Sequence, residues 1–437
     1  MPEIDWADPY PAQVIQGNNT FALDLFRKLV RDQESDTRSR DSNLFFCSYS
    51  ILAAFVMAYA GARATTAAQI AETLYFPPNS LELHHVFAAL MQTLEKAEAQ
   101  YQLTAANKFW MKQNFRAEPA YLDLLRQYYD SEVGRFKDVA DLQVQANDWV
   151  AEQTQNKIPA IFRDEPNPST KFVLLNAVYF KATWLEPFDK DATKSGQFHL
   201  LNGSTIAIDM MYGVKKEYTY QQFPEYGLEV IELPYKGGTE DDVPTASMAI
   251  ILPARDVDIR ALCGTLTYEL IQSLLSAEDE FNDFEDEFLY SPRSETLHLT
   301  MPKFKLSSLF SIRSSLCGMG ITQAFDEANA NFSGINPLAY LFEAQHATFL
   351  EVNEETTEAA GATALSGGTR SAATPIEVTV DRPFILLILD ASTRAPFQDR
   401  ERGCDRSVLF AGRILDPSQF EAAELEGKRC QVDPHFR

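Results

Sequence analysis

A single arginine, Arg370, ends a long run of small residues, EETTEAAGATALSGGTRS, at positions 354–371. It is the only basic residue between Glu354 and Asp381. A guanidinium group pairs with a carboxylate in a fork-like geometry, so an exposed arginine can be recognised by an acidic pocket of a partner. Clusters of Gly, Ser, Ala and Thr, however, usually mark linkers. The segment alone leaves both interpretations open.

Motifs typical of enzymes are missing from the chain. It has no GxSxG, HExxH, P-loop or GxGxxG motif. The CxxC and CxxH spacings of a zinc site are also missing, so we expect no metal, no cofactor and no catalytic residue. The six histidines are dispersed: His84, His85, His199, His298, His346 and His435. Because triads are recognised by geometry rather than spacing, a hydrolase stays an alternative.

The charge balance argues against nucleic acid as a partner. Of the 437 residues, 62 are acidic and 38 basic, which gives a formal net charge of -24. Such a chain repels a phosphate backbone and suits a basic partner. No apolar run approaches the roughly 18 residues of a membrane span, and MPEIDWADPYPAQ lacks the features of a secretory signal. We expect a cytoplasmic protein, or one released without a signal peptide and able to act outside the cell, and no membrane association.

The cysteines predict free thiols. Their number is odd and their spacing wide, as in proteins of reducing compartments. They are Cys47, Cys263, Cys317, Cys404 and Cys430. A Cys404–Cys430 pair remains an alternative, because sequence does not fix proximity.

The order of periodic segments predicts an α+β fold. Three helices are expected in the first third: NNTFALDLFRKLVRDQ behind an Asn/Thr start signal, ILAAFVMAYAGA as a buried helix, and ANDWVAEQTQNKIPAIF ending near Asn156. From Lys171 onward strand-like runs dominate: KFVLLNAVYFKATW, TIAIDMMY, LEVIELPY, SMAIILP, LHLTMPKFKL, IEVTV, FILLIL and SVLFAGRIL. Helices followed by many strands indicate large mixed or antiparallel sheets. Residues 276–288 and 392–406 are interpreted as surface insertions, and 418–437 as a polar tail.

Several stretches together resemble the serpin family of serine protease inhibitors. Those that match in order and spacing are NAVYFKATWLEPFDKDATKSGQFHL, MPKFKLSSLFSIRSSLCGMGITQAF, NFSGI, LFEAQHATFLEVNEETTEAAGATAL and DRPFILLIL with LFAGRILDP. The resemblance implies a serpin fold of three β-sheets and about nine helices in a single domain over 1–417. It also implies a monomeric inhibitor that is not an enzyme, with an exposed reactive-centre loop at about 354–380.

The residue pattern of the loop fits insertion into a sheet. Alternate residues of a strand face opposite sides. One set contains no charged side chain and is almost entirely small: Thr357, Ala359, Gly361, Thr363, Leu365 and Gly367. The other set contains the charged Glu358: Glu358, Ala360, Ala362, Ala364, Ser366 and Gly368. Roughly 15 residues at about 3.3 Å each make a strand of about 50 Å, the length of a domain.

The resemblance also implies the bond that is cleaved. The family's usual spacing, counted from Glu354, brings the specificity position to Arg370, with Ser371 after the scissile bond. Arginine suits a trypsin-like pocket with an aspartate at its base, so the expected partner is an Arg-specific serine protease held in a covalent 1:1 complex. The expected hinge comprises Glu354, Glu355, Thr356, Thr357, Glu358, Ala359, Ala360, Gly361, Ala362 and Thr363.

Further positions carry over from the family one at a time. Ser50, Asn176 and His346 match the polar shutter at the centre of the main sheet, and Trp184 matches the tryptophan of the breach where insertion begins. Taken alone, an Asn or His in an apolar run is usually a satisfied core group.

The chain also departs from the family pattern. Thr356 stands where inhibitory members usually have glycine, which restricts the hinge and supports the alternative of a non-inhibitory serpin with a chaperone, carrier or storage role. Cys47 and Ser48 replace the usual serine and proline, which puts some shutter hydrogen bonds in question. The segment 82–98, ELHHVFAALMQTLEKAE, has one lysine, so we expect no activation by heparin.

Overall fold

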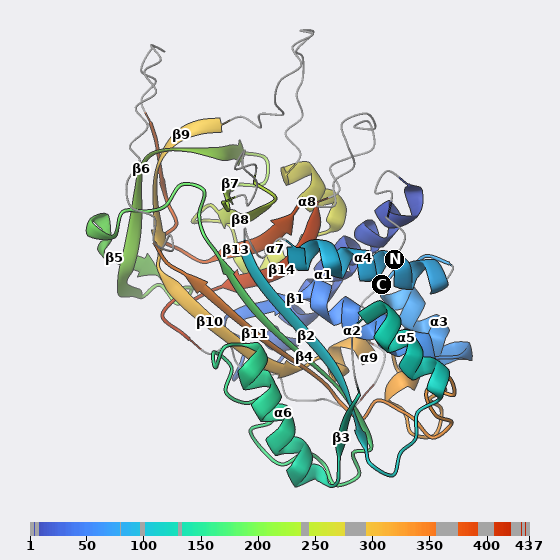
Figure 1. Ribbon diagram of the computed structural model, residues 1–437. Coiled ribbons are helices and arrows are strands. Elements are labelled where there is room, and N and C mark those ends of the chain that lie inside the picture. The colour runs from blue at the N-terminus through green and yellow to red at the C-terminus, as the bar shows by residue number, and fades with distance from the viewer. Residues whose placement is uncertain are drawn as a thin grey trace.

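The computed structural model describes residues 4, 8–78, 80–96, 101–129, 133–236, 244–275, 294–354, 375–391, 406–420, 430 and 433. Nine α-helices and two short 3₁₀ helices lie in this part of the chain (Figure 1): α1 (Pro9–Glu34), α2 (Ser48–Gly61), α3 (Ala64–Thr73), α4 (Ser80–Lys96), α5 (Pro119–Tyr129), α6 (Val139–Gln153), η2 (Lys190–Ala192), α7 (Ile259–Thr265), α8 (Tyr268–Leu275), α9 (Arg313–Met319) and η3 (Gln323–Phe325).

A five-stranded sheet crosses the centre of the molecule, with α6 beside one face (Figure 1). Its order is β10 (Phe304–Ser311), β11 (Ala344–Val352), β4 (Phe172–Ala182), β2 (Tyr101–Lys112) and β3 (Gly134–Phe136). The inner pair, β11 and β4, is parallel, while β10 is antiparallel to β11 and β2 is antiparallel to β4.

The other described strands form a nine-stranded sheet. Its order is β1 (Leu44–Cys47), β14 (Ser407–Ile414), β13 (Phe384–Asp390), β8 (Ala246–Pro253), β7 (Leu228–Pro234), β6 (Thr205–Phe223), β9 (Ser294–Pro302) and β12 (Ile376–Thr379), with β5 (Lys194–His199) paired to β6. The long β6 pairs with β5 at its start, with β9 along its middle and with β7 at its end. It therefore joins two of the three sheets that the resemblance implies into one hydrogen-bonded sheet, and the α+β serpin fold is confirmed.

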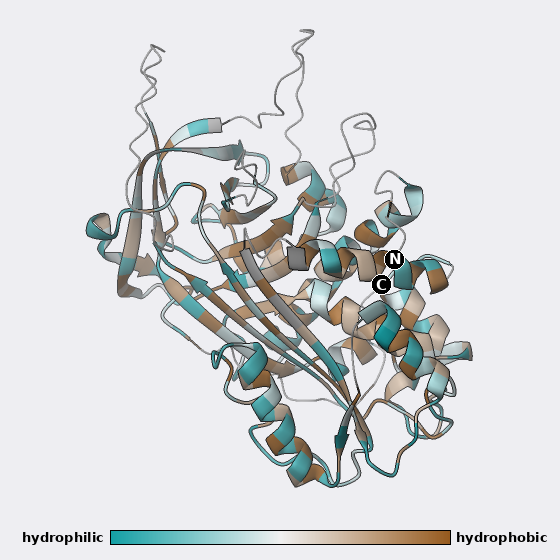
Figure 2. Cartoon of the chain, in the orientation of Figure 1, coloured by the Kyte–Doolittle hydropathy of each residue, from teal (hydrophilic) through white to brown (hydrophobic). Residues whose placement is uncertain are grey.

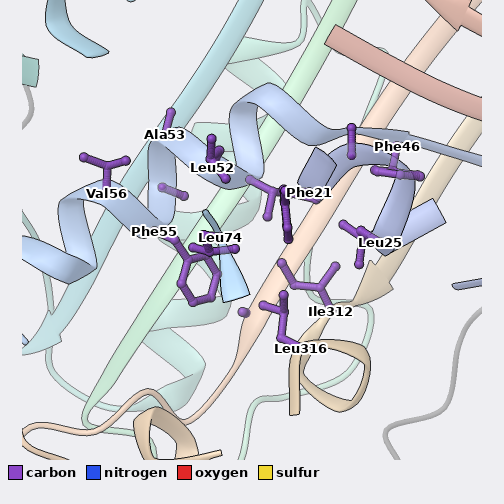
Figure 3. Packing of buried hydrophobic residues seen from close by; sticks show 14 of the residues in the cluster. Phe21, Leu25, Phe46, Leu52, Ala53, Phe55, Val56, Leu74, Ile312 and Leu316 are labelled. Atoms are coloured by element: carbon purple, nitrogen blue, oxygen red, sulfur yellow. The ribbon is translucent and has the colours of Figure 1, made fainter. Parts of the chain in front are cut away.

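Helix α2 lies in the centre of the core, as its apolar sequence predicts. Every residue from Ser48 to Ala58 is buried. The hydrophobic cluster around α2 includes its own Phe55 together with Phe21 and Leu25 of α1 and Leu316 of α9 (Figure 3). Helix α6 instead carries hydrophilic as well as hydrophobic residues (Figure 2). Among the described helices, none combines the length and apolarity needed to cross a membrane.

Two predictions of secondary structure were wrong. Helix α1 begins at Pro9 rather than near Asn18, because Asp8 caps it by accepting a hydrogen bond from the N–H of Tyr10. Asn18 is instead buried inside the helix and donates to the carbonyl of Val408. Strands also occur before Lys171, since β2 (Tyr101–Lys112) lies between β4 and β3 in the five-stranded sheet.

The prediction of five free thiols was also wrong. Cys317 and Cys430 form a disulfide, with Cα atoms 5.1 Å apart across a sequence separation of 113 residues. The same bond rules out the Cys404–Cys430 alternative. Cys47 and Cys263 are free and buried. Cys404 lies outside the described residues, as do the acidic insertion 276–288 and all but Arg406 of the insertion 392–406.

Candidate functional site

The contact between β4 and β11 forms a seam in the five-stranded sheet. Seven residues of β11, from Ala344 to Leu350, pair in parallel with Leu174 to Phe180 of β4. Parallel neighbours require a long connection, and here the chain makes many other elements between the two strands. A segment that turned back after β11 would run antiparallel to both strands of the seam.

The predicted shutter residues meet at the middle of this seam. His346 pairs directly with Asn176 across it. The Oδ1 atom of Asn176 accepts hydrogen bonds from Ser50 Oγ, at 2.9 Å, and from His346 Nδ1. The amide nitrogen of Asn176 donates to Asn107 Oδ1 on β2, at 2.6 Å. One buried amide therefore links β11, β4, β2 and α2, and its capacity to form hydrogen bonds is well used.

The hydrogen-bond partners of His346 determine which ring nitrogen carries the proton. The backbone N–H of Cys47 can only donate, and it lies 3.1 Å from Nε2, so Nε2 accepts and the proton resides on Nδ1. Burial lowers the pKa of His346 to about 3, because the apolar surroundings disfavour the charged ring. The imidazole is neutral at physiological pH and acts as a hydrogen-bonded latch.

The replacements at Cys47 and Ser48 leave this network intact. The bond to His346 comes from the main chain of Cys47, which any residue except proline supplies. Ser48 Oγ donates to the carbonyl of Val408, at 2.9 Å. The thiol of Cys47 is fully buried, and burial raises its pKa to about 12. It is therefore an inert small hydrophobe.

Trp184 lies at the end of the seam from which the loop departs. Its Nε1 donates to the carbonyl of Asn353, at 2.9 Å, and its ring stacks on Tyr235 with centroids 4.7 Å apart. Only 4% of Trp184 is exposed. The tryptophan therefore holds the residue immediately before the first hinge position.

Glu354, the first residue of the expected hinge, is a buried carboxylate with 3% exposure. Lys303 Nζ lies 2.8 Å from one carboxylate oxygen, and Thr193 Oγ1 donates to the other at 2.7 Å. Burial alone would raise the pKa of Glu354, but the hydrogen bonds from Lys303 and Thr193 and the charge of Lys303 outweigh it and lower the pKa. The start of the loop is thus anchored in its charged form.

The remaining predicted positions, 355–363 of the hinge and the bond Arg370–Ser371, lie outside the described residues. Sequence reasoning missed Asn107, Thr193 and Lys303. Thr193 and Lys303 lie within stretches that match the family, but no local signal marked either residue as a partner of Glu354, and Asn107 lies outside those stretches. Each residue reaches the site from a strand or loop distant in sequence. No group of three or more His, Cys, Asp or Glu side chains that could hold a metal occurs in the part of the chain that the structure covers.

Comparisons with known proteins agree with this architecture. A family model described as Serpin (serine protease inhibitor) matches residues 16–417. The chain is 31% identical to Serpin B6 of Macaca fascicularis over 409 residues, covering 92% of this chain and 99% of the relative. It is 32% identical to the leukocyte elastase inhibitor of Xenopus tropicalis, covering 91% and 97%.

Among solved structures, human thyroxine-binding globulin in complex with thyroxine superimposes with a TM-score of 0.77 at 25% identity. The alignment covers 94% of this chain and 100% of that one. The family match over most of the chain, together with the seam and its shutter, shows that this chain belongs to the serpin family of serine protease inhibitors, which are not enzymes.

Proposed function

We propose that the chain is an irreversible suicide-substrate inhibitor of trypsin-like serine proteases, cleaved between Arg370 and Ser371. The observation that carries this proposal is the seam: β4 and β11 are direct, parallel neighbours, and the chain leaves β11 at the anchored Glu354. A strand formed by the following residues would enter between them and pair with both.

The fit of such a strand follows from the residues themselves. An inserted strand antiparallel to β4 and β11 satisfies the backbone groups that the parted seam would expose. Its inward face would carry Thr357, Ala359, Gly361 and Thr363, none of which is bulky enough to clash in a packed layer. Family membership in protease inhibitors also removes the hydrolase alternative.

The chemistry is performed by the target. Its serine attacks the carbonyl of Arg370, forming an ester to the protease and releasing the amine of Ser371. Insertion of the freed hinge then carries the acylated protease along the sheet. Distortion of its oxyanion hole or triad prevents water from completing hydrolysis, so a covalent 1:1 complex remains. Because insertion must release free energy, the uncleaved form is kinetically trapped.

Incubation with trypsin tests this proposal. We expect a complex that survives denaturing electrophoresis, together with a released fragment whose N-terminal sequence begins at Ser371. The Arg370→Lys variant should still trap trypsin, whereas Arg370→Gln should not, because it removes the positive charge that the pocket selects. A fragment with another N-terminus would overturn the cleavage site, and cleavage at Ser371 without a complex would overturn the trap.

A second candidate is a non-inhibitory serpin. It is favoured by Thr356 at the hinge and by the structural similarity to a protein that binds thyroxine. On this candidate the loop would be cut by trypsin as an ordinary substrate, without a rise in thermal stability.

A further inference from the structure

The end of the chain, beyond the family match at residue 417, is attached to the sheet. The carbonyl of Phe420 accepts a hydrogen bond from the N–H of Ser307, at 2.8 Å. Ser307 belongs to β10, the edge strand of the five-stranded sheet. The ring of Phe420 also packs against Phe349 of β11, with centroids 6.2 Å apart. The start of the tail therefore covers part of an open sheet edge.

A second attachment lies at α9. Cys430 is bonded to Cys317, which is fully buried in the core, whereas Cys430 itself is partly exposed. The N–H of Asp433 donates to the carbonyl of Gly318, at 3.0 Å. A side chain at position 318 would come within 2.4 Å of Lys28, so this glycine allows α1 and the tail to approach α9 closely.

Ion pairs connect Asp433 to α1. The Asp433 carboxylate lies 3.7 Å from Lys28 Nζ and 4.0 Å from Arg31. Lys28 is nearly buried and also pairs with Asp32, at 2.6 Å. The tail residues Phe420, Cys430 and Asp433, here called the tail anchor, thus contact β10, β11, α9 and α1. Of these elements, β10 and β11 lie on one side of the seam, and β4, β2 and β3 lie on the other.

We propose that Cys317–Cys430 is a redox-controlled staple that holds the tail to α9 and α1 without locking the seam between β11 and β4. The proposal does not depend on which bond of the reactive-centre loop is cleaved, nor on the inhibitory mechanism. A dithiol reductant opens it: its thiolate attacks the sulfur of the partly exposed Cys430, and Cys317 leaves and takes up a proton. The second thiol then releases Cys430, so two electrons and two protons pass to the protein and the reductant becomes a disulfide.

Reduction should loosen one region selectively. Cys430 and Asp433 lose their covalent tether, so the hydrogen bond to Gly318 and the ion pairs with Lys28 and Arg31 must form against the entropy of an untethered segment. Helix α9 then loses partners at its C-terminal end. The shutter residues Asn176 and His346, which make no contact with the tail anchor through any of these bonds, should keep their protection.

Cysteine mapping is the first step of the test. Full-length protein prepared without reductant is denatured, alkylated and digested. We expect three alkylated cysteines, Cys47, Cys263 and Cys404, and a disulfide-linked peptide pair containing Cys317 and Cys430. Five alkylated cysteines, or a pair containing Cys404, would overturn the proposal.

Amide hydrogen exchange then measures the effect. After reduction with dithiothreitol under native conditions, exchange in α9 should accelerate by about tenfold or more, with unchanged exchange in β4. Cys430→Ser should behave like the reduced protein, and Cys404→Ser, the matched control, like the oxidised one. If Cys430→Ser fails to fold, reduction of the native protein still decides. Unchanged exchange in α9, or equal acceleration in β4, would refute a staple that holds α9 and leaves the seam free.

Discussion

His346 of β11 and Asn176 of β4 pair directly across the seam, and the Nδ1–H of the imidazole donates to the amide oxygen. The latch is therefore made by the two strands that must separate if the loop is to enter. Opening the sheet at this rung leaves buried polar groups without partners, which opposes opening until another strand replaces them.

Removal of the Asn176 amide should lower the native-state stability more than removal of one of the groups that donate to it. Asn176→Ala leaves His346 Nδ1–H and Asn107 Oδ1 without this partner and leaves Ser50 with only the carbonyl of Cys47. We expect a loss of about 3 kcal/mol of native-state stability. Ser50→Ala removes one donor and leaves the bond between His346 and Asn176, so about 1 kcal/mol is expected. Thermal unfolding of the two variants compares these costs. Equal losses would show that the amide is not the centre of the network.

Acid should destabilise the protein through two buried histidines. Burial lowers the pKa of His346 to about 3, and burial together with the charge of His85 lowers that of His84 to about 4. Unfolded histidine titrates near 6.5. The stability that these neutral histidines contribute is therefore complete above about pH 6.5. It is lost as the pH falls toward their native-state pKa values, at up to about 1.4 kcal/mol per pH unit for each group.

Histidine variants identify the source of this pH dependence. Melting temperatures measured between pH 7.5 and 4.5 should fall less steeply for His346→Gln and for His84→Gln than for the parent protein. His199→Gln is the matched control, because 44% of that side chain is exposed. A slope that neither buried variant reduces would assign the acid sensitivity to other groups.

The ion pair between Lys303 and Glu354 at the start of the loop should contribute more to stability than the neighbouring pair between Lys305 and Glu351. Lys303→Met leaves the buried Glu354 with Thr193 as a hydrogen-bond donor, whereas Lys305→Met affects the more exposed Glu351, which Lys305 contacts at 3.0 Å. We expect Lys303→Met to lower the melting temperature by about 1 to 3 °C and Lys305→Met to lower it less. The exchange Glu354→Lys with Lys303→Glu should recover part of the loss. A double variant whose melting temperature is no higher than those of the two single variants would exclude a direct pairing of residues 303 and 354.

Hinge flexibility should control the outcome of each encounter with a protease. Thr356→Gly removes a β-branched side chain, so the cleaved loop can change conformation faster. More of the acyl-enzyme should then be trapped before hydrolysis. The number of inhibitor molecules consumed per trypsin inactivated should fall, and an unchanged or higher number would mean that Thr356 does not limit insertion.

Much of the fold could be predicted from local patterns, because the buried strands β8, β13 and β14 are rich in apolar residues, β4 is apolar on both sides of Asn176, and β7 combines apolar with acidic residues. Strand β2 was missed because AANK, in its middle, lacks the β-branched and aromatic residues that mark a strand. Its place is determined by pairing with β4, which is a tertiary constraint.

The site was predictable only where the resemblance to a family supplied it. Asn176 and His346 are 170 residues apart, and no local pattern brings them together. Lys303 and Thr193 were missed because a buried carboxylate selects its partners by proximity in space. The disulfide was missed for the same reason, since Cys317 and Cys430 are separated by 113 residues and no local pattern pairs them.

Cleavage of the loop should make the protein markedly more stable if the freed segment enters the seam. An inserted strand replaces one ladder with two along the seven paired residues of β4 and β11. At about 1 kcal/mol per added hydrogen bond, this contributes roughly 7 kcal/mol and a rise on the order of 10 °C in melting temperature. Thr357→Arg is the control, because a guanidinium on the inward face cannot be buried there without a partner. The cleaved control should melt near the uncleaved protein, and a cleaved parent that shows no rise would exclude insertion.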